Sequence, residues 1–402
     1  MANTILTSDI LAREALLILE NNLVMGNLVD RRYEGEFSSG RQGDAIRIRR
    51  PASFSVNEFT NNGSNTVPTQ AATEFSTTLT LEKFFDVSFQ VTAKEMALSI
   101  DDFSANLMQP AMAAMAQQLD SYILSKHVEI GGNAEKAAAG TQISDLADVA
   151  KVVQRLNEQK APMSGRSLVV SPKVMTALFG ITEFTQAQQR GDGGSALREA
   201  SLGRFMGLDI YMDQNVTTHT AGTMRSDSDR AALAIHLDSN GVKKGVNTIK
   251  IDDANASAST MVVGDVIRIT HSGSGKTHDY AIAATGATVS YSGFDSGATV
   301  TISPPLYEDV ATNDVVEFVM TATGLEQSIA FNSNAIAMAM VPLDEPLGPG
   351  TDSSVVSHNG YSMRASITYN HAKKIDEVSL DVLCGAKVVQ PEMAVRLPTS
   401  AA

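Results

Sequence analysis

A long polar segment, residues 36–92, has the pattern of an extended β-ribbon, and it runs directly into an Ala- and Met-rich helical segment, 101–129. Apolar and basic residues alternate over 44–51, and alternation returns over 75–91 after a tip rich in Asn, Ser and Thr. A two-stranded ribbon is marginal in water and needs a surface to lie against. If its own fold offers no such surface, its partner is another copy of the chain, so this feature points to assembly.

The composition sets the outer bounds of the fold. The chain has 402 residues, of which 43% are hydrophobic, so two or three domains with substantial cores are expected. Its single cysteine, Cys384, excludes an intramolecular disulfide and a cysteine-based zinc cluster, and we expect it to be buried in a C-terminal strand. Residues 1–9 lack the basic start and apolar core of a signal peptide. We therefore expect a soluble protein that is cytoplasmic when made.

The charge balance argues against several classes of partner. There are 31 Lys and Arg residues against 45 Asp and Glu residues, which gives a formal net charge of -14. A chain with this balance has no broad affinity for nucleic acid or for an anionic membrane. A role in gene regulation is therefore not expected.

Two helices are predicted on either side of the ribbon. The apolar spacing over 8–22, with Ser8 and Asp9 as cap, predicts an amphipathic N-terminal helix with one apolar face. In 101–129, Pro110 should kink the helix or mark its effective start. A stripe of methionines on this second helix is expected to serve packing: Met108, Met112 and Met115.

Helix and strand patterns then alternate, which predicts a compact α+β unit. Helices are predicted over 145–157 and 172–179, and strands over 167–171 and 208–213. From 217 to about 323 the helical period disappears, and a small antiparallel barrel or sandwich is predicted. Six short strands are expected in it: 248–251, 266–270, 280–283, 288–291, 299–303 and 315–320.

The strand-rich block is expected to be inserted into the α+β unit, because a helix–strand pattern resumes over 328–340. Three further strands are predicted near the C-terminus, over 363–369, 377–382 and 386–389.

Three local patterns invite a catalytic interpretation, and each fails on spacing or context. The run 273–277, Gly-Ser-Gly-Lys-Thr, ends like a phosphate-binding loop, but Thr270 stands where that loop needs its first glycine, so a tight turn between strands is predicted. His271 and His278 flank this turn without a third metal ligand and are expected to be surface histidines. The acidic pairs are expected at a helix start or in turns: Asp101-Asp102, Asp252-Asp253 and Glu308-Asp309. We expect no catalytic, cofactor or metal site, and no enzyme.

The order of these parts resembles a tailed-bacteriophage major capsid (coat) protein with the Hong Kong 97 fold. The resemblance rests on Phe-Phe-Asp-Val-Ser-Phe at 84–89, on Leu-Asp-Ser-Tyr-Ile-Leu at 119–124 and on the segment 381–392. The strand-rich block is similar to the insertion domain of short-tailed Salmonella phage coat proteins. This second likeness runs through four segments: 248–251, 263–269, 300–304 and 335–342.

The resemblance implies an α+β fold made of an N-terminal arm, an extended loop, a spine helix, and peripheral and axial domains, with an inserted small antiparallel β-barrel domain. The implied boundaries are 1–35 for the arm, 36–92 for the extended β-loop, 93–140 for the spine helix and peripheral domain, 141–216 for the axial and peripheral α+β domain, 217–325 for the inserted β-barrel, and 326–402 for the return to the axial and peripheral domains.

The function implied by the resemblance is that of a major capsid protein that assembles into an icosahedral shell around double-stranded DNA. Its partners would be many copies of itself as hexamers and pentamers, a scaffolding protein and a portal protein, with no sequence-specific DNA binding and no membrane. It would reside in the virion capsid after assembly in the host bacterial cytoplasm. From the residues, Arg47, Arg49 and Arg50 are expected on one side of the ribbon as candidate inter-subunit contacts with the acidic peripheral region of a neighbour.

Two other classes of function remain open from the sequence. One is a β-rich surface-binding or adhesion module, in which the block 217–323 carries recognition on an α+β platform. The other is a hydrolase with an unrecognised site, although none of the 7 histidines has a nucleophile partner by motif.

Overall fold

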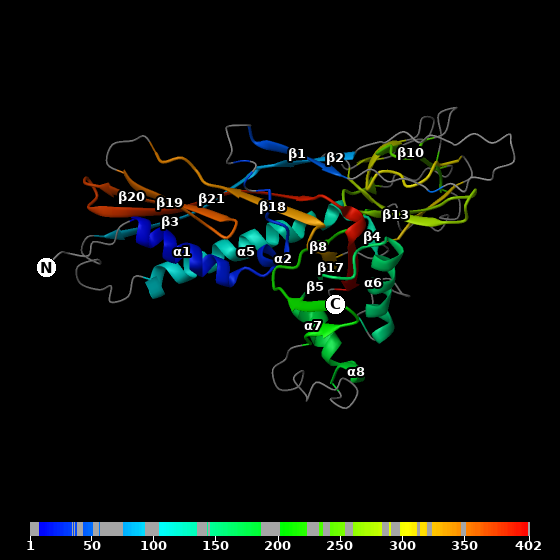
Figure 1. Cartoon of the computed structure of the whole chain (residues 1–402), viewed down its shortest axis with the longest axis horizontal. Coiled ribbons are helices and arrows are strands. Elements are labelled where there is room, and N and C mark those ends of the chain that lie inside the picture. Colours follow the sequence, from blue (N-terminus) through cyan, green and yellow to red (C-terminus); the bar gives the residue numbers. More distant parts are fainter. Residues whose placement is uncertain are drawn as a thin grey trace.

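The structure is a computed structural model of the whole chain (Figure 1). It describes residues 8–33, 35, 37, 43–50, 56, 75–92, 104–134, 143, 145–185, 202–222, 233–235, 242–253, 260–283, 289–290, 298–311, 314–319, 324–346 and 351–400. The predicted ribbon tip and the pair Asp101-Asp102 lie outside these residues.

The elongated part of the molecule is a five-stranded antiparallel sheet with two helices on its inner face (Figure 1). The helices are α1 (Ser8–Asn22) and α5 (Gln109–Ser125). The strands are β3 (Lys83–Thr92), β21 (Ile375–Val388), β20 (Tyr361–Asn370), β19 (Thr351–His358) and β18 (Ile336–Val341). Strand β21 pairs with β3 along one side and with β20 and β18 along the other, so β3 lies at one edge of the sheet, and β18 and β19 lie at the other. We call this unit the body sheet.

The N-terminal helix belongs to the core of the body sheet. Its predicted bounds are confirmed, and Leu11, Leu16 and Leu19 are at most 2% exposed against α5 and the sheet. The apolar face expected on an arm is therefore satisfied within the chain.

The second helix is shorter than predicted. Regular α-helix begins at Gln109 with Pro110 in the first turn, so the proline marks the effective start. A π-helical turn, Ser104–Met108, precedes it, and a 3-10 turn, Lys126–Glu129, follows it. The packing role of the methionine stripe is confirmed, because Met108, Met112 and Met115 are all buried in the core.

Within the described residues, the predicted returning strand of the ribbon is divided into two strands. Strands β1 (Ala45–Arg50) and β2 (Phe75–Thr80) pair antiparallel, from Ala45 opposite Thr80 to Arg50 opposite Phe75. The predicted returning strand breaks after Thr80, and its second half leaves the ribbon as β3 to pair with β21. The change of pairing partner between β2 and β3 depends on β21, which lies about 290 positions away in the sequence.

The ribbon also has a surface to lie against in its own chain, which corrects the premise of the assembly argument. Its inner side chains Ile46, Ile48 and Leu79 are buried against Ala337 and Val389. The ribbon therefore covers the β18 end of the body sheet on the face opposite to the helices.

A second lobe is built on a mixed seven-stranded sheet. The strands are β4 (Gly132–Asn133), β22 (Ala394–Ser400), β17 (Leu325–Asn332), β5 (Arg166–Val170), β7 (Leu208–Met212) and β6 (Arg204–Phe205), with β8 (Thr218–His219) paired to β17. Helices α6 (Leu146–Glu158) and α7 (Pro172–Phe179) cover it, followed by α8 (Thr182–Thr185). The predicted helices and strands of the α+β unit are confirmed here. The helix expected within 328–340 is wrong, because β17 and β18 occupy this segment as buried strands.

The strand-rich block lies between β8 and β17. Six strands pair in the order β10 (Thr248–Asp253), β15 (Ala298–Ser303), β13 (Thr277–Ile282), β12 (Val266–Thr270), β16 (Val315–Phe318) and β9 (Leu233–Ile235), and β9 pairs in turn with β10, so the ring of strands closes. The predicted strand at 288–291 is β14 (Val289–Ser290), which pairs instead with β11 (Thr260–Met261). Because β8 pairs directly with β17, the chain leaves the seven-stranded sheet and returns to it at neighbouring positions.

The block touches the rest of the molecule through a close-packed, partly charged junction. Arg396 of β22 is completely buried, and its Nη1 donates a hydrogen bond of 2.7 Å to the carbonyl oxygen of Gly264 in the block. Burial lowers the pKa of Arg396 to about 9. A methyl group on Gly131 would lie 2.9 Å from Pro304 of the block, so the two parts touch without intervening side chains.

Near the C-terminus the two predicted strands 377–382 and 386–389 are one long strand, β21. Cys384 lies in it with no exposed surface, as predicted. Gly385 is the point at which the ribbon crosses β21, because a side chain there would overlap the backbone carbonyl of Thr80.

Candidate assembly surface

The outer face of the ribbon is cationic and rich in hydroxyl groups. Arg47 and Arg49 are exposed and alternate with the buried Ile46 and Ile48. Opposite them on β2 stand Thr78 and Ser76, and Arg47 Nε donates a hydrogen bond of 2.8 Å to Ser76 Oγ. This face, which we call the arginine face, can present guanidinium groups to a carboxylate-bearing surface.

Arg50 does not belong to the arginine face, which corrects the expectation of three arginines on one side. Adjacent side chains of a strand point to opposite faces, so Arg50 turns inward with Ile46 and Ile48. Its Nη1 lies 3.1 Å from Glu392 Oε1 of the same chain, and its side chain is only 11% exposed. Arg50 therefore fastens the ribbon to its own chain.

The base of the ribbon is held by Glu82, between β2 and β3. Its Oε1 accepts hydrogen bonds of 2.7 Å from Tyr122 Oη and from Lys126 Nζ, at the C-terminal end of α5. The hydrogen bond from Lys126, followed by that from Tyr122, lowers the pKa of the Glu82 carboxyl. The ribbon is thus anchored at both ends by charged groups.

The outer face of the body sheet is polar, and much of it remains open to solvent. Four serines stand side by side across four strands: Ser88, Ser379, Ser366 and Ser353. Three carboxylates flank this row, and one of them, Asp381, is paired with Arg364 of the same face. Asp86 accepts hydrogen bonds from Ser379 and Ser88, and Glu377 accepts one of 3.2 Å from Gln90. We call this area the hydroxyl face.

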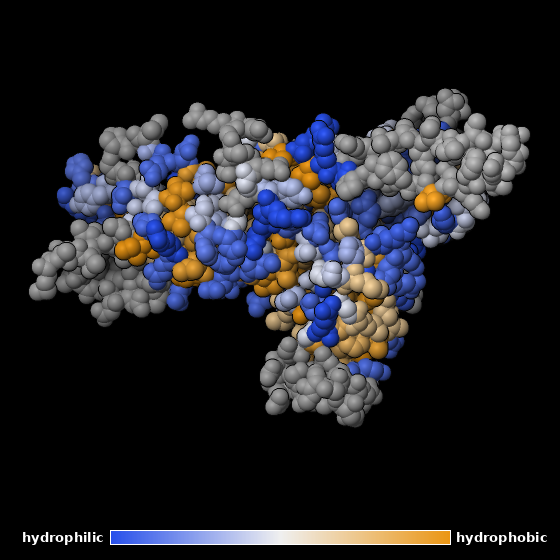
Figure 2. All heavy atoms as spheres, viewed as in Figure 1, coloured by the Kyte–Doolittle hydropathy of each residue, from blue (hydrophilic) through white to orange (hydrophobic). Residues whose placement is uncertain are grey.

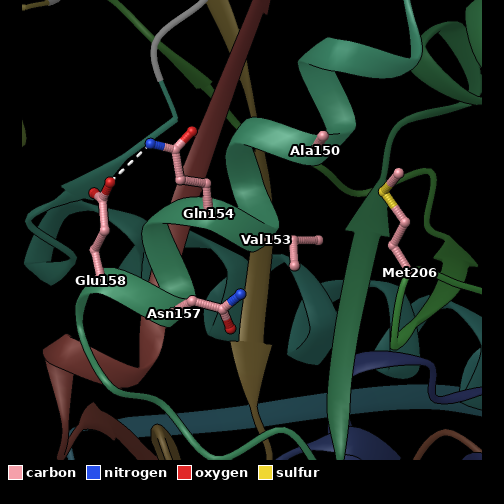
Figure 3. Close-up of a pocket in the computed structure, with 6 residues that line it drawn as sticks. All are labelled: Ala150, Val153, Gln154, Asn157, Glu158 and Met206. Atoms are coloured by element: carbon pink, nitrogen blue, oxygen red, sulfur yellow. Dashed lines mark hydrogen bonds between the residues drawn. The ribbon is translucent and has the colours of Figure 1, made fainter.

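A shallow hollow of about 560 Å³ lies on the outside of the second lobe, where Figure 2 shows apolar side chains over α7 and toward α6. Val153 of α6 and Met206 of the β6–β7 turn lie on either side of it (Figure 3). Its full lining is Ala150, Val153, Gln154, Asn157, Glu158 and Met206. Glu158 is the one ionisable side chain among these residues and accepts a hydrogen bond of 2.8 Å from Gln154, so the hollow has neither a nucleophile nor an acid–base pair.

The glycine-rich run at 273–277 is a tight turn, as predicted. It joins β12 to β13, Gly275 adopts a φ of +66°, and its N–H donates to His271 O. A phosphate-binding loop would instead lead into a helix.

The expectation of surface histidines is wrong for His271. It is 2% exposed, and its Nδ1 lies 3.2 Å from Asp314 Oδ2. The His271 and His278 rings are 5.5 Å apart. Asp252 and Asp253, expected in a turn, lie in β10.

Two negative findings apply to the described residues. They contain no group of three or more His, Cys, Asp or Glu side chains arranged to hold a metal ion. None of the helices within them is long and apolar enough to cross a lipid bilayer.

A buried carboxylate caps the short helix after α1. Asp120 of α5 accepts hydrogen bonds from the backbone N–H groups of Val24, at 2.8 Å, and Gly26, at 3.1 Å, at the start of α2 (Met25–Leu28). Burial raises the pKa of Asp120 to about 7, and the charge of Asp213 adds to the rise, while the backbone donors oppose it.

This raised pKa predicts a pH-dependent stability. The folded chain keeps a proton on Asp120 that the unfolded chain, with a pKa of 3.8, has released. The contribution of this proton to the free energy of unfolding is therefore full below the pKa of the unfolded chain. It is lost as the pH rises toward 7, by at most about 1.4 kcal/mol per pH unit. In urea unfolding at several pH values, Asp120→Asn should remove this part of the slope. Parallel pH profiles for the wild type and Asp120→Asn would contradict the prediction.

The structure reveals partners that the sequence interpretation missed. The alternation of 44–51 already separates Arg50 from Arg47 and Arg49, and this signal was available but not used. The pairing of Arg50 with Glu392 joins residues 342 positions apart, and no local pattern marks Glu392.

Comparison with known proteins supports the fold. Neither a protein-family model nor a curated protein sequence matches the chain. A solved chain from Mycobacterium phage Che8 superposes with a TM-score of 0.52 at 16% identity, over 93% of this chain and 90% of that one. The asymmetric unit of the bacteriophage PhiM1 mature capsid is less similar, with a TM-score of 0.45 at 11% identity over 90% of this chain and 83% of that one. The capsid of an empty GTA particle superposes with a TM-score of 0.44 at 9% identity, over 94% of this chain and 90% of that one. The resemblance to tailed-phage capsid proteins is confirmed at the level of the fold.

Proposed function

We propose that this chain, which has a tailed-phage capsid fold, is the major capsid protein that forms the icosahedral shell around the double-stranded DNA of a tailed bacteriophage. The observation that carries the proposal is the match to the Che8 structure along nearly the whole of both chains. In this assignment α5 is the spine helix, the body sheet belongs to the peripheral domain and the seven-stranded sheet to the axial domain. The block between β8 and β17 is the insertion domain.

The arginine face is the candidate donor surface between neighbouring subunits. Arg47 and Arg49 point away from their own chain's core, whereas the hydroxyl face offers Asp86 and Glu377 next to its row of serines. Opposite charges across an interface select partner and register more than they add affinity. We assign the hydroxyl face of a neighbouring copy as the acceptor, so the ribbon bridges subunits while Glu82 and Arg50 hold its two ends on its own chain.

The proposed partners follow from the same assignment. They are copies of this chain in hexamers and pentamers, a scaffolding protein during assembly in the host bacterial cytoplasm, and a portal protein. Packaged DNA would be enclosed without sequence-specific contacts, in keeping with the formal net charge of -14. The proposed role is structural and requires no catalysis.

Shell assembly tests the proposal and the arginine face together. The chain, produced in bacteria alone and with its scaffolding partner, should yield round shells, spirals or tubes in fast-sedimenting gradient fractions examined by negative-stain electron microscopy. Arg47→Ala/Arg49→Ala should lower the yield of such particles and leave the far-ultraviolet circular dichroism of the monomer unchanged, because both side chains lie on the outer face.

Arg50→Ala is the matched control for these variants. It should lower the stability of the monomer, since it breaks the contact with Glu392. Wild-type particle yield from the double variant would refute the arginine face. A single slow species from the wild type under both conditions would refute the capsid proposal and favour a binding module.

A further inference from the structure

The body sheet ends in an edge strand, β19, that has no Pro, Lys or bulge. Within the described part of the chain, β19 pairs with β20 alone. Natural edge strands usually avoid further pairing through Pro, Lys, a bulge or a covering segment. Residues 351–358, Thr-Asp-Ser-Ser-Val-Val-Ser-His, contain no Pro, Gly or Lys and run as a regular strand. The edge is therefore able to accept another strand.

Helix α1 runs alongside this edge. Ser354 Oγ donates to Asp9 Oδ1 at 3.5 Å, and Asn359 Nδ2 donates to Glu20 Oε1 at 2.7 Å. The helical span from Asp9 to Glu20 measures about 16 Å and the strand from Ser354 to His358 about 13 Å, with Asn359 next in the turn, so helix and strand run side by side in the same direction. On this scale Val355 lies level with the point midway between Asp9 and Arg13.

We infer that β19 pairs antiparallel with β19 of a second copy, across a two-fold axis at Val355. Side chains opposite each other must point to the same face, so the axis passes through a residue and not between two residues. With the axis at Val355, Asp352 of each copy stands opposite His358 of the other, and the pairing extends over the whole of 352–358. Moving the axis to Ser354 keeps an overlap of the same length but loses this match, and moving it to any other residue of the strand also shortens the overlap.

The helices beside the strands are self-complementary about the same axis. Because the axis lies level with the midpoint between Asp9 and Arg13, Asp9 of one copy lies level with Arg13 of the other. Within each copy Arg13 Nε and Asp9 Oδ1 form an ion pair of 3.1 Å, and both side chains remain exposed, Asp9 by 50% and Arg13 by 69%. The two ion pairs therefore lie beside each other across the axis with opposite charges level, which favours a second copy of this chain over an unrelated strand.

Such a contact is isologous, so it closes after two copies and does not propagate as an open fibre. It extends the body sheet across the axis and continues its inner apolar face, to which Val356 and Ile367 contribute. The inference goes beyond the proposed function, because the paired sheet requires only two copies and no shell.

Cysteine cross-linking tests the axis directly. Val355→Cys places two thiols opposite each other, with Cβ atoms about 4.5–5.5 Å apart in a directly opposed pair, near the span of a disulfide. Val355 is partly exposed on the outer face, and the native Cys384 is buried. After mild oxidation, a non-reducing gel should show Val355→Cys mainly as a disulfide dimer.

Ser353→Cys and Ser357→Cys are the matched controls on the same face of the strand. In the proposed register each lies about 13 Å from its own counterpart, beyond the reach of a disulfide, whereas Ser353 stands opposite Ser357. Each variant alone should stay monomeric on the gel, and a mixture of the two should cross-link. Cross-linking of Val355→Cys no greater than that of Ser353→Cys would overturn the inference. So would a dimer of Ser357→Cys alone, because it requires another register.

The same gel separates this inference from the capsid proposal. A disulfide dimer of Val355→Cys in a preparation without shells would support the two-fold contact while the capsid proposal fails. Shells in which Val355→Cys stays monomeric would support the capsid proposal and overturn the two-fold contact.

Discussion

Gly385→Ala is expected to displace the ribbon and to lower the free energy of unfolding by about 3 kcal/mol, the upper part of the usual range for overpacking. The added Cβ would overlap the carbonyl oxygen of Thr80 and lie 2.9 Å from its carbonyl carbon and 3.1 Å from Leu81 Cα. All three are backbone atoms, so no rotation of a side chain relieves the overlap. The ribbon must lift from β21, which exposes Ile46, Ile48 and Leu79. Urea unfolding followed by circular dichroism measures the loss, and particle yield reports the displaced ribbon.

Gly273→Ala is the control for that substitution. A methyl group there has no neighbour within 4 Å, so the free energy of unfolding should change by no more than about 0.5 kcal/mol. If Gly385→Ala is as stable as Gly273→Ala, the ribbon does not cross β21 at this point.

Leu16→Ala is expected to lower the free energy of unfolding of the monomer by about 3 kcal/mol, because it leaves a cavity between α1, α5 and the body sheet. Its neighbour Leu17 is 55% exposed on the opposite side of the same helix, and Leu17→Ala should cost no more than about 0.5 kcal/mol. Urea unfolding at a concentration where the chain is monomeric compares the two variants. If α1 were a detachable arm, neither substitution would change the stability of the monomer.

Elements with local stop and start signals were predicted closely from the sequence. Helix α7 has its predicted bounds, because Pro172 fixes the first turn and Ser171 Oγ accepts a hydrogen bond from Val174 N. Strand β12 also matches, since its turn residues end it sharply.

Elements whose state depends on distant partners were not predicted. Strands β17 and β18 are buried on both faces, and the apolar residues of such a segment do not alternate in a way that distinguishes a buried strand from a helix. The split between β2 and β3 follows from the pairing of β3 with β21. The alternation of side chains along the sequence shows no change at this point. The burial of His271 depends in the same way on Asp314, 43 positions further along the chain.

The candidate assembly surface was predicted in part. Arg47 and Arg49 lie where the alternation of 44–51 places them, on the outside of β1. Arg50 does not lie there, because adjacent side chains of a strand point to opposite faces. Its partner Glu392 belongs to a distant part of the chain.

The pairing of β8 with β17 makes the strand-rich block a module that evolution can exchange. Both ends of the block meet at one place in the seven-stranded sheet, so a longer, shorter or different domain fits between them without moving any strand of that sheet. Arg396 restricts this freedom. Its buried guanidinium gives a hydrogen bond to Gly264 of the block, and any replacement must bring an acceptor to the same point or arrive with a change at position 396.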